Sequence, residues 1–289
     1  MAEGVIMRCG KSEFRWGERT YVMGIINVSP DSFSGDGLTS TESALAQAQR
    51  MVSEGADILD IGGESTRPGA SAVTIEEELA LVIPAVRQIA SQVNIPISVD
   101  STKYEVVRQA LEAGAAIIND QWGLKQEPRL ADLAAEKGVP LILMSNQRDK
   151  GGYDAAIKRD TAYYNDIITE VISSLRNSIH LANQAGVRRE NLILDPGLGF
   201  GKTWQFDMEI IRRLDELKEL ERPILVGPSR KSFIKMVLNL PAKERVEGTA
   251  AAVAIAISKG ADIVRVHDVK EMVRVCQVSD AIMRPANPQ

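Results

Sequence analysis

The chain of 289 residues has little of several things that mark specialised classes of protein. Its two cysteines, Cys9 and Cys276, are too few for a disulfide framework and lie too far apart for the spacing of a metal site. No apolar run reaches the roughly 18 residues of a membrane-spanning helix, and the N-terminus lacks the apolar core of a signal peptide. These absences predict a cytoplasmic protein.

Aromatic residues are also scarce, at 4% of the sequence, whereas Ala, Val, Ile and Gly are plentiful, which suits a tightly layered α/β core. The net charge of -5 argues against a general binder of nucleic acid or anionic membranes, but it leaves room for a local cationic pocket. Because α/β barrels often run to about 250 residues, we expect one domain over residues 1–289, with its core at about 20–285.

Eight short apolar runs, separated by helix-like segments, predict buried parallel strands. The runs are Tyr21–Val28, Ile58–Gly62, Ile97–Asp100, Ala116–Asp120, Leu141–Met144, Leu192–Asp195, Ile224–Gly227 and Ile263–His267. Eight such repeats favour a (β/α)₈ barrel, with an open doubly wound sheet as the alternative. Residues 8–19, ahead of the first run, are expected to form a small hairpin.

Between the runs, two capping-box patterns mark helix starts, Thr74 with Glu77 and Thr102 with Glu105. Pro84 should kink the first of these helices. Further helices are expected over 41–54, 155–185 and 204–217. The segment 246–259 is apolar nearly all round, which predicts burial, in the core or at a subunit contact.

Nearly every predicted strand ends in a polar group, and in a barrel the carboxyl ends of the strands build the active site. The residues at these ends are Asn27, Asp60, Glu64, Asp100, Asn119, Asp120, Met144, Asn146, Asp195, Ser229, Lys231, Arg265 and His267. Helix capping would explain one or two of them. A full ring of polar groups indicates a polar ligand.

Asp100, Asn119 and Asp195 supply acceptors and an amide that both donates and accepts hydrogen bonds. A flat nitrogen heterocycle, such as a guanine-like or pterin ring, would satisfy them. Internal caps and strand-to-strand hydrogen bonds remain the alternative for each residue taken singly.

A second group of residues at the strand ends is cationic and suits a phosphate or pyrophosphate. It comprises Arg67, Lys231, Arg265 and His267. Arg265 and His267 are two residues apart on one strand, so their side chains should point to the same face. The side-chain oxygen of Asn27 can coordinate a hard cation.

Two glycine- and serine-rich loops, 27–37 and 62–69, follow the first two strands. Both exceed the about 2–6 residues of an ordinary βα loop, which predicts mobile lids.

Six motifs, in order along the chain, resemble those of dihydropteroate synthase. They are Met23-Gly-Ile-Ile-Asn-Val-Ser-Pro-Asp-Ser-Phe33, Asp60-Ile-Gly-Gly-Glu-Ser-Thr-Arg-Pro-Gly69, Asn119-Asp-Gln-Trp-Gly123, Asp195-Pro-Gly-Leu-Gly-Phe-Gly201, Gly227-Pro-Ser-Arg-Lys-Ser-Phe233 and Val264-Arg-Val-His267. The resemblance runs from about Arg8 to the C-terminus. It implies a (β/α)₈ barrel that joins 6-hydroxymethyl-7,8-dihydropterin pyrophosphate to p-aminobenzoate, giving 7,8-dihydropteroate and pyrophosphate in folate synthesis.

The resemblance also assigns roles to individual residues. The pterin would be held by Asp100, Asn119, Asp195 and Lys231, with Met144 and Arg265 against its ring faces. Arg265 and His267 would bind the pyrophosphate, and Asn27 its Mg²⁺. The p-aminobenzoate site, where sulfonamides also bind in this family, would be shaped by Phe33, Thr66, Arg67, Pro68, Phe200 and Ser232. A homodimer is expected.

Two positions depart from the family pattern. The acidic residue of the first loop, Asp36, stands one position away from its usual place, which puts a catalytic role for it in doubt. Ser145 follows Met144 where the family often has His, which changes the pocket wall.

Three other functions remain open on the sequence. A pterin-dependent corrinoid methyltransferase would share the barrel and the pterin residues, but it would need neither the Ser-Thr-Arg-Pro-Gly nor the Ser-Arg-Lys-Ser-Phe segment. An aldolase would use Lys231 to form a Schiff base. A non-catalytic pterin binder would bind its ligand without releasing pyrophosphate.

Overall fold

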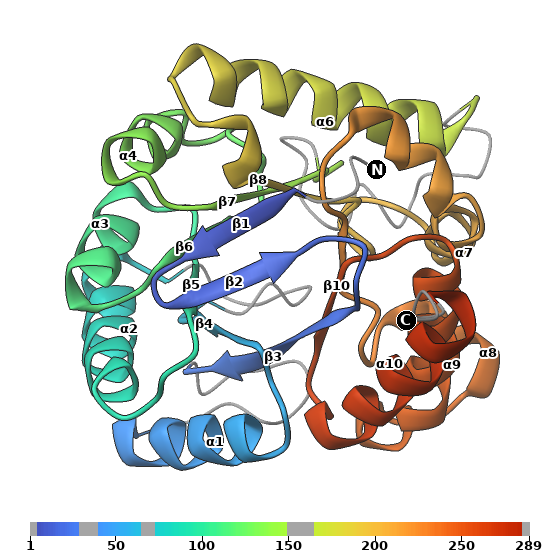
Figure 1. Ribbon diagram of the computed structural model, residues 1–289, viewed down its shortest axis with the longest axis horizontal. Coiled ribbons are helices and arrows are strands. Elements are labelled where there is room, and N and C mark those ends of the chain that lie inside the picture. Colours follow the sequence, from blue (N-terminus) through green and yellow to red (C-terminus); the bar gives the residue numbers. More distant parts are fainter. Residues whose placement is uncertain (1–4, 29–39, 65–72, 149–164, 285–289) are drawn as a thin grey trace, which may run out of the picture.

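The computed structural model describes residues 5–28, 40–64, 73–148 and 165–284. These residues form a (β/α)₈ barrel with a short hairpin across one end (Figure 1). The predicted barrel is therefore confirmed, and the open doubly wound sheet is excluded. Within the described ranges, no helix is long and apolar enough to cross a bilayer.

Eight parallel strands make the barrel wall in sequence order, and each pairs with its neighbours in the ring. They are β3 (Tyr21–Asn27), β4 (Ile58–Gly62), β5 (Ile97–Asp100), β6 (Ile117–Asp120), β7 (Leu141–Met144), β8 (Leu192–Asp195), β9 (Leu225–Val226) and β10 (Ile263–Val266). A bridge from Leu194 of β8 to Ile224, next to β9, brings the two edges of the sheet together. Each strand lies within its predicted run.

Helices surround the strands, as Figure 1 shows. They are α1 (Thr41–Ser53), α2 (Ile75–Ala90), α3 (Tyr104–Ala113), α4 (Arg129–Lys137), α6 (Ile167–Gln184), α7 (Trp204–Arg212), α8 (Ser232–Leu238), α9 (Val246–Ser258) and α10 (Val269–Met283). Short 3₁₀ turns lie at Arg189–Asn191, Leu214–Leu220 and Ala242–Glu244. Of the predicted helix 155–185, the part from Ile167 is confirmed, and residues 155–164 lie outside the described ranges.

The helix starts test the two predicted capping boxes. At α2 the box is complete, since the Thr74 hydroxyl accepts from the Glu77 N–H and the Glu77 carboxylate accepts from the Thr74 N–H. At α3 the prediction is wrong, because the N-cap is Lys103, which makes no side-chain capping bond. Glu105 instead accepts hydrogen bonds from Arg108, one turn further along the same helix. Helix α2 continues as one helix through Pro84.

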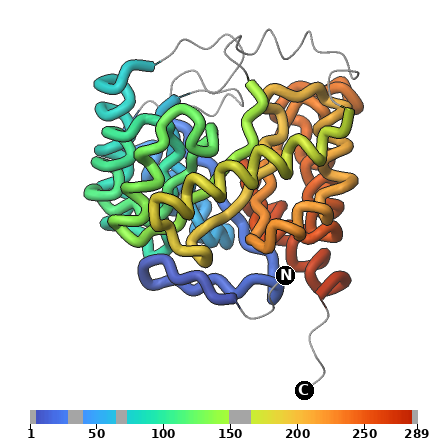
Figure 2. The backbone as a smooth tube through the Cα atoms, turned by 90° about the horizontal axis from the view of Figure 1, so that it is seen from above, coloured from blue at the N-terminus to red at the C-terminus, as the bar shows by residue number. Residues whose placement is uncertain are grey.

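The predicted N-terminal hairpin, β1 (Ile6–Cys9) and β2 (Ser12–Arg15), closes the base of the barrel. Figure 2 shows it at one end of the molecule. Phe14 packs against Trp16 and Tyr21. One apolar cluster joins hairpin and barrel and includes Met7, Phe14, Trp16, Tyr21, Met23, Ile58, Ile117, Ile142, Ile193, Leu225 and Ile263. The interior near the amino ends of the strands is therefore an apolar floor.

Candidate active site

The barrel interior changes from apolar to polar over a distance of two residues along most strands. Side chains two positions apart on a strand point to the same side. The residue two positions after each floor residue therefore also faces the barrel interior. These residues are Ile25, Asp60, Asn119, Met144, Asp195, Gly227 and Arg265, and Asp100 follows the interior Ser98 in the same way. The sequence therefore places a charged layer directly above the floor.

Arg265 is the centre of this layer. Its Nε donates to Asp60 Oδ2 at 2.6 Å and its Nη2 to Asp100 Oδ2 at 2.7 Å. Asn119 Nδ2 donates to the same Asp60 oxygen at 3.0 Å. Burial disfavours the charged guanidinium, but Asp60 and Asp100 outweigh that effect and hold the pKa of Arg265 above its ordinary value. These four residues, from β4, β5, β6 and β10, form one hydrogen-bonded network.

Asp100 stands at the carboxyl end of β5, with its side chain almost fully buried. Burial raises the pKa of Asp100 to about 7; Arg265 lowers it, the neighbouring charge of Asp60 raises it, and a hydrogen bond from Gln121 lowers it. The carboxyl group therefore changes charge near neutral pH, a property typical of functional sites.

Asp195 lies at the end of β8, where the glycine-rich loop begins. Its Oδ1 accepts the Gly197 N–H at 2.7 Å, which fixes the orientation of the carboxyl group. Burial raises the pKa of Asp195, whereas the charges of Lys231 and Arg265 lower it. Of the two oxygens, Oδ2 is the one left to face a ligand.

Lys231 immediately precedes α8, whose first residue is Ser232. The Lys231 Nζ lies 4.5 Å from the centre of the Phe200 ring, so the glycine-rich loop and the start of α8 meet. Burial, reinforced by the charge of Arg265, lowers the pKa of Lys231 to about 8, while Asp207 and Asp195 act in the opposite direction. The Arg148 guanidinium lies 4.6 Å from the centre of the same ring.

His267 follows β10, and its Nδ1 lies 2.9 Å from Ser229 Oγ. The same oxygen accepts the backbone N–H of His267 at 3.2 Å, so the Ser229 hydroxyl hydrogen can be donated to Nδ1. The Ser229 hydroxyl thus fixes the orientation of the imidazole ring, one residue beyond the strand that carries Arg265.

Asn27 is the last residue of β3 and is partly exposed at the mouth of the barrel. Among the described residues there is no cluster of three or more His, Cys, Asp or Glu side chains that could hold a metal. Mg²⁺ commonly binds through one or two protein oxygens together with substrate phosphates and water. A single amide oxygen at this position fits that pattern.

Some predicted residues lie outside the described ranges. They are Phe33, Asp36, Thr66, Arg67 and Pro68, together with most of both glycine-rich loops, 27–37 and 62–69. Their predicted roles and the predicted lid function stay predictions. Met144 is buried at the end of β7, next to the fully buried Ser145.

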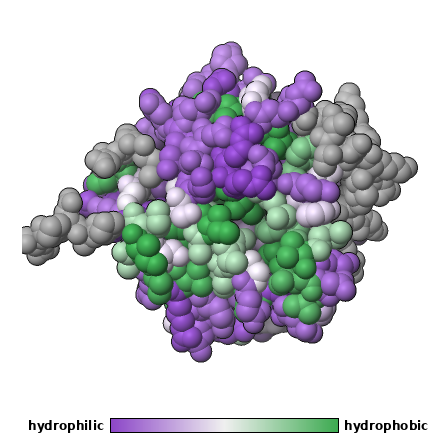
Figure 3. Space-filling model, turned by 90° about the vertical axis from the view of Figure 1, so that its right-hand side faces the viewer, coloured by the Kyte–Doolittle hydropathy of each residue, from purple (hydrophilic) through white to green (hydrophobic). Residues whose placement is uncertain are grey.

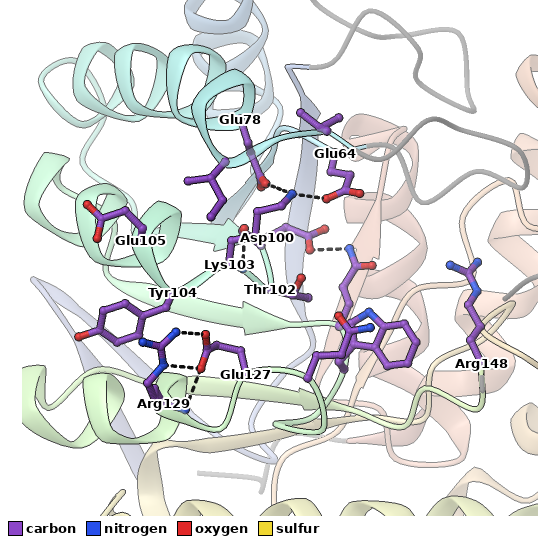
Figure 4. Close-up of a pocket in the computed structure, with 16 residues that line it drawn as sticks. Glu64, Glu78, Asp100, Thr102, Lys103, Tyr104, Glu105, Glu127, Arg129 and Arg148 are labelled. Atoms are coloured by element: carbon purple, nitrogen blue, oxygen red, sulfur yellow. Dashed lines mark hydrogen bonds and ion pairs between the residues drawn. The ribbon is translucent and has the colours of Figure 1, made fainter. Parts of the chain in front are cut away.

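A hollow of about 800 Å³ opens beside Asp100, between the starts of α2, α3 and α4 (Figure 4). Lys103 crosses it and forms short ion pairs with Glu64 and Glu78, at 2.5 Å each. Glu78 is fully buried, and its other oxygen has no hydrogen-bond partner among the described residues. Gln121, which also lines this hollow, donates from its Nε2 to Asp100 Oδ1.

The sequence does not reveal several residues that organise this site. Asp60 was noted at a strand end, yet it serves as the internal partner of Arg265 and Asn119. Gln121 and Lys103 gave no signal, because their partners are distant in sequence. Lys202 directly follows the motif that ends at Gly201, but nothing in that motif indicates where the lysine side chain lies.

Comparison with known proteins places this geometry in a family. A family model described as "Pterin binding enzyme" matches residues 23–267. Dihydropteroate synthase from Clostridium beijerinckii is 46% identical over 280 residues, covering 96% of this chain and 100% of that protein. Among solved structures, dihydropteroate synthase from Yersinia pestis with a sulfonamide drug superposes with a TM-score of 0.89 at 40% identity, covering 96% of this chain and 98% of the other.

A second solved structure, dihydropteroate synthase from Clostridium difficile in the presence of pteroic acid, gives a TM-score of 0.85 at 43% identity, covering 94% of this chain and 99% of the other. Both the sequence and the barrel thus agree over nearly the full length. The chain belongs to the dihydropteroate synthase family of pterin-binding enzymes.

Proposed function

We propose that the chain joins 6-hydroxymethyl-7,8-dihydropterin pyrophosphate to p-aminobenzoate, as a transferase of folate synthesis, through the residues gathered around Arg265. The observation that carries the residue assignment is the charged layer itself. Carboxylates, an amide and cations lie together at one end of the barrel interior, above an apolar floor.

The pterin is held by Asp195, Asn119, Asp100 and Lys231. A carboxylate accepts from adjacent ring N–H and amino groups, and the free Oδ2 of Asp195 suits that role. The amide of Asn119 keeps its carbonyl oxygen for a ligand, because its Nδ2 is engaged by Asp60. The Met144 side chain packs against one face of the pterin ring, and the planar Arg265 guanidinium stacks on the other.

The reaction breaks the bond between the pterin methylene carbon and the pyrophosphate oxygen, and the electron pair leaves with pyrophosphate. Arg265 and His267 stabilise the departing negative charge through N–H donors. The ionised form of Asp100 stabilises the positive charge left on the pterin methylene. The amino nitrogen of p-aminobenzoate then forms the new C–N bond and loses a proton. Water must be excluded until that bond has formed.

Mg²⁺ is part of this proposal, with the oxygen of Asn27 as its protein ligand. When bound, it would offset the negative charge of the pyrophosphate. Support comes from the position of Asn27 at the barrel mouth and from the preference of Mg²⁺ for oxygen.

The p-aminobenzoate site is proposed next to Phe200 and Ser232, with Phe33, Thr66, Arg67 and Pro68 completing it. Support comes from the contact of the Lys231 ammonium with the Phe200 ring, because Lys231 is also proposed to hold the pterin. A solved relative binds a sulfonamide, and we propose that sulfonamides compete with p-aminobenzoate here.

Calorimetry with a pterin ligand separates the two sites. Asp195→Ala should abolish pterin binding, whereas Arg67→Ala should bind the pterin almost normally and use p-aminobenzoate poorly. Equal losses of pterin affinity in both variants would contradict the assignment.

Pyrophosphate release tests the reaction itself. Release should require both substrates together. Tight pterin binding without release would indicate a non-catalytic binder, and methyl transfer to a corrinoid protein would indicate the rival enzyme.

We also propose a homodimer formed through α8, α9 and α10. Figure 3 shows hydrophobic residues gathered on this side of the molecule. The exposed apolar side chains of these helices are Met236, Val237, Leu238, Ile255, Val278, Ile282 and Met283. A patch of this kind commonly marks a protein interface.

Analytical ultracentrifugation tests the dimer. Ile282→Glu should give a monomer, and Leu181→Glu, a matched change on the exposed side of α6, should stay dimeric. A wild-type protein that sediments as a monomer at micromolar concentration would contradict the proposal.

A cytoplasmic location is proposed as well, supported by Cys9 and Cys276, which are unpaired and buried.

A further inference from the structure

Lys202 is a buried lysine whose ammonium, among the described residues, binds backbone carbonyls and no carboxylate. Only 8% of the residue is exposed. Its Nζ donates to the carbonyl oxygens of Ser145 at 2.7 Å, Gly197 at 2.9 Å and Phe200 at 3.2 Å. An ammonium group has three N–H donors, so these contacts use all of them.

The three carbonyls belong to two walls of the site. Ser145 follows β7, and its N–H donates to the Asp195 carbonyl at 2.8 Å. Gly197 donates its N–H to the Asp195 carboxylate. Phe200 carries the ring that lies against Lys231. Lys202 therefore ties the end of β7 to both ends of the loop that holds Asp195 and Phe200.

The backbone of the 195–201 loop packs tightly against the 145–147 segment. A Cβ on Gly197 would lie 2.4 Å from the Ser145 carbonyl oxygen, and one on Gly201 would lie 2.2 Å from the Gln147 carbonyl carbon. Both glycines have positive φ, +71° and +72°, which side chains of other residues rarely allow. The backbone of the loop is thus pressed directly against the 145–147 segment, at the level where Lys202 binds.

The electrostatic surroundings of Lys202 are mixed. Burial lowers the pKa of Lys202 to about 7, the carboxylates of Asp207 and Asp195 act against this, and Lys125 and Lys231 add to it. Asp207 is fully buried and accepts the Gly199 N–H at 2.8 Å. Two buried side chains therefore hold the loop, Lys202 through its carbonyls and Asp207 through an N–H.

We propose that Lys202 is a positioning residue, which fixes the distance between the Asp195 carboxyl group and the Phe200 ring without contacting substrate. The proposal rests on the proposed function, in which these two groups bind the two substrates. Displacement of a bound reactant by about 1 Å can cost on the order of 100-fold in rate. Loss of Lys202 should therefore impair the joining step more than it impairs binding of either substrate alone.

Lys202→Met tests this in the full-length protein, with Lys137→Met, an exposed lysine of α4, as the control. We expect kcat/KM for p-aminobenzoate to fall about 10- to 100-fold. The affinity for a pterin ligand, measured by calorimetry, should fall by much less. An unchanged kcat/KM would overturn the proposal. So would a fall in kcat no larger than the fall in the folded fraction measured by circular dichroism, because that pattern indicates fewer folded molecules rather than a displaced reactant.

Chemical rescue supplies a second readout. Lys202→Cys is alkylated with 2-bromoethylamine in the unfolded state and then refolded, which restores an amine of nearly the same length; Cys9→Ala and Cys276→Ala remove the two other thiols beforehand. Recovery of kcat/KM supports positioning by the amine, and failure to recover counts against it.

If Lys202→Met does not fold, Lys202→Gln, which keeps two N–H donors, takes its place with a smaller effect expected. Failure of both to fold would assign Lys202 to stability and overturn the proposal. Failure of the proposed function itself would be evident beforehand, as absence of pyrophosphate release by the wild-type protein.

Discussion

Replacing Lys103 by Met should destabilise the protein through the carboxylate that the lysine leaves behind. Glu78 is fully buried and its Oε2 pairs with the Lys103 Nζ, while its other oxygen has no partner among the described residues. Removing one member of a buried ion pair typically costs about 3–5 kcal/mol, because the remaining charge is uncompensated. Water reaches this pair, since 20% of the Lys103 side chain is exposed. We therefore take the lower end, about 3 kcal/mol.

Urea unfolding would measure this change, followed by fluorescence of the three tryptophans. Adding Glu78→Gln to Lys103→Met should restore part of the stability, because the amide carries no charge. Lys137→Met is the matched control, since Lys137 pairs with Glu136 at the surface and its loss should change little. The reasoning is refuted if Lys103→Met costs no more than the control, or if the second substitution makes the protein less stable.

Three further predictions follow from other parts of the barrel. Asp60→Asn removes a negative charge that raises the pKa of Asp100. Because the ionised Asp100 is the active form, the acidic limb of the pH profile of kcat/KM, expected near pH 7, should move to lower pH. A limb that stays in place or moves to higher pH would count against the assignment. Gly201→Ala should destabilise strongly in thermal unfolding, because its φ is +72° and the new Cβ would lie 2.2 Å from the facing backbone. Gly138→Ala, at φ +65° with open space around it, should cost only about 1–2 kcal/mol, and equal effects of the two would refute the clash argument. Phe14→Ala should cost about 3–5 kcal/mol in urea unfolding while leaving kcat unchanged per folded molecule, and a selective loss of kcat would contradict a purely structural floor.

The barrel was predictable because its strands are buried on both faces. A parallel strand covered by helices outside and side chains inside reads as a short continuous apolar run, and all eight runs were recognised with ends correct to within one residue. The polar residue closing each run was also readable, as at Asp100 and Asp195. The capping box at Thr74 was confirmed, since both partners lie within one turn of helix.

What the sequence could not provide was the pairing between distant residues. Arg265 and Asp60 are 205 positions apart, and their hydrogen bond depends on the barrel being closed. The capping prediction at Thr102 failed for a related reason. The pattern is local, but the Glu105 carboxylate accepts hydrogen bonds from Arg108 instead of capping the helix. Lys103, at the start of the same helix, forms ion pairs with Glu64 and Glu78 across the hollow.

The hairpin at the base has a consequence for how molecules reach the site. Met7 and Phe14 block the amino end of the barrel, so a substrate cannot pass through the interior and must enter and leave on the same side. Entry and exit are in this way confined to the rim formed by the carboxyl ends of the strands, on the opposite side of the floor from the hairpin.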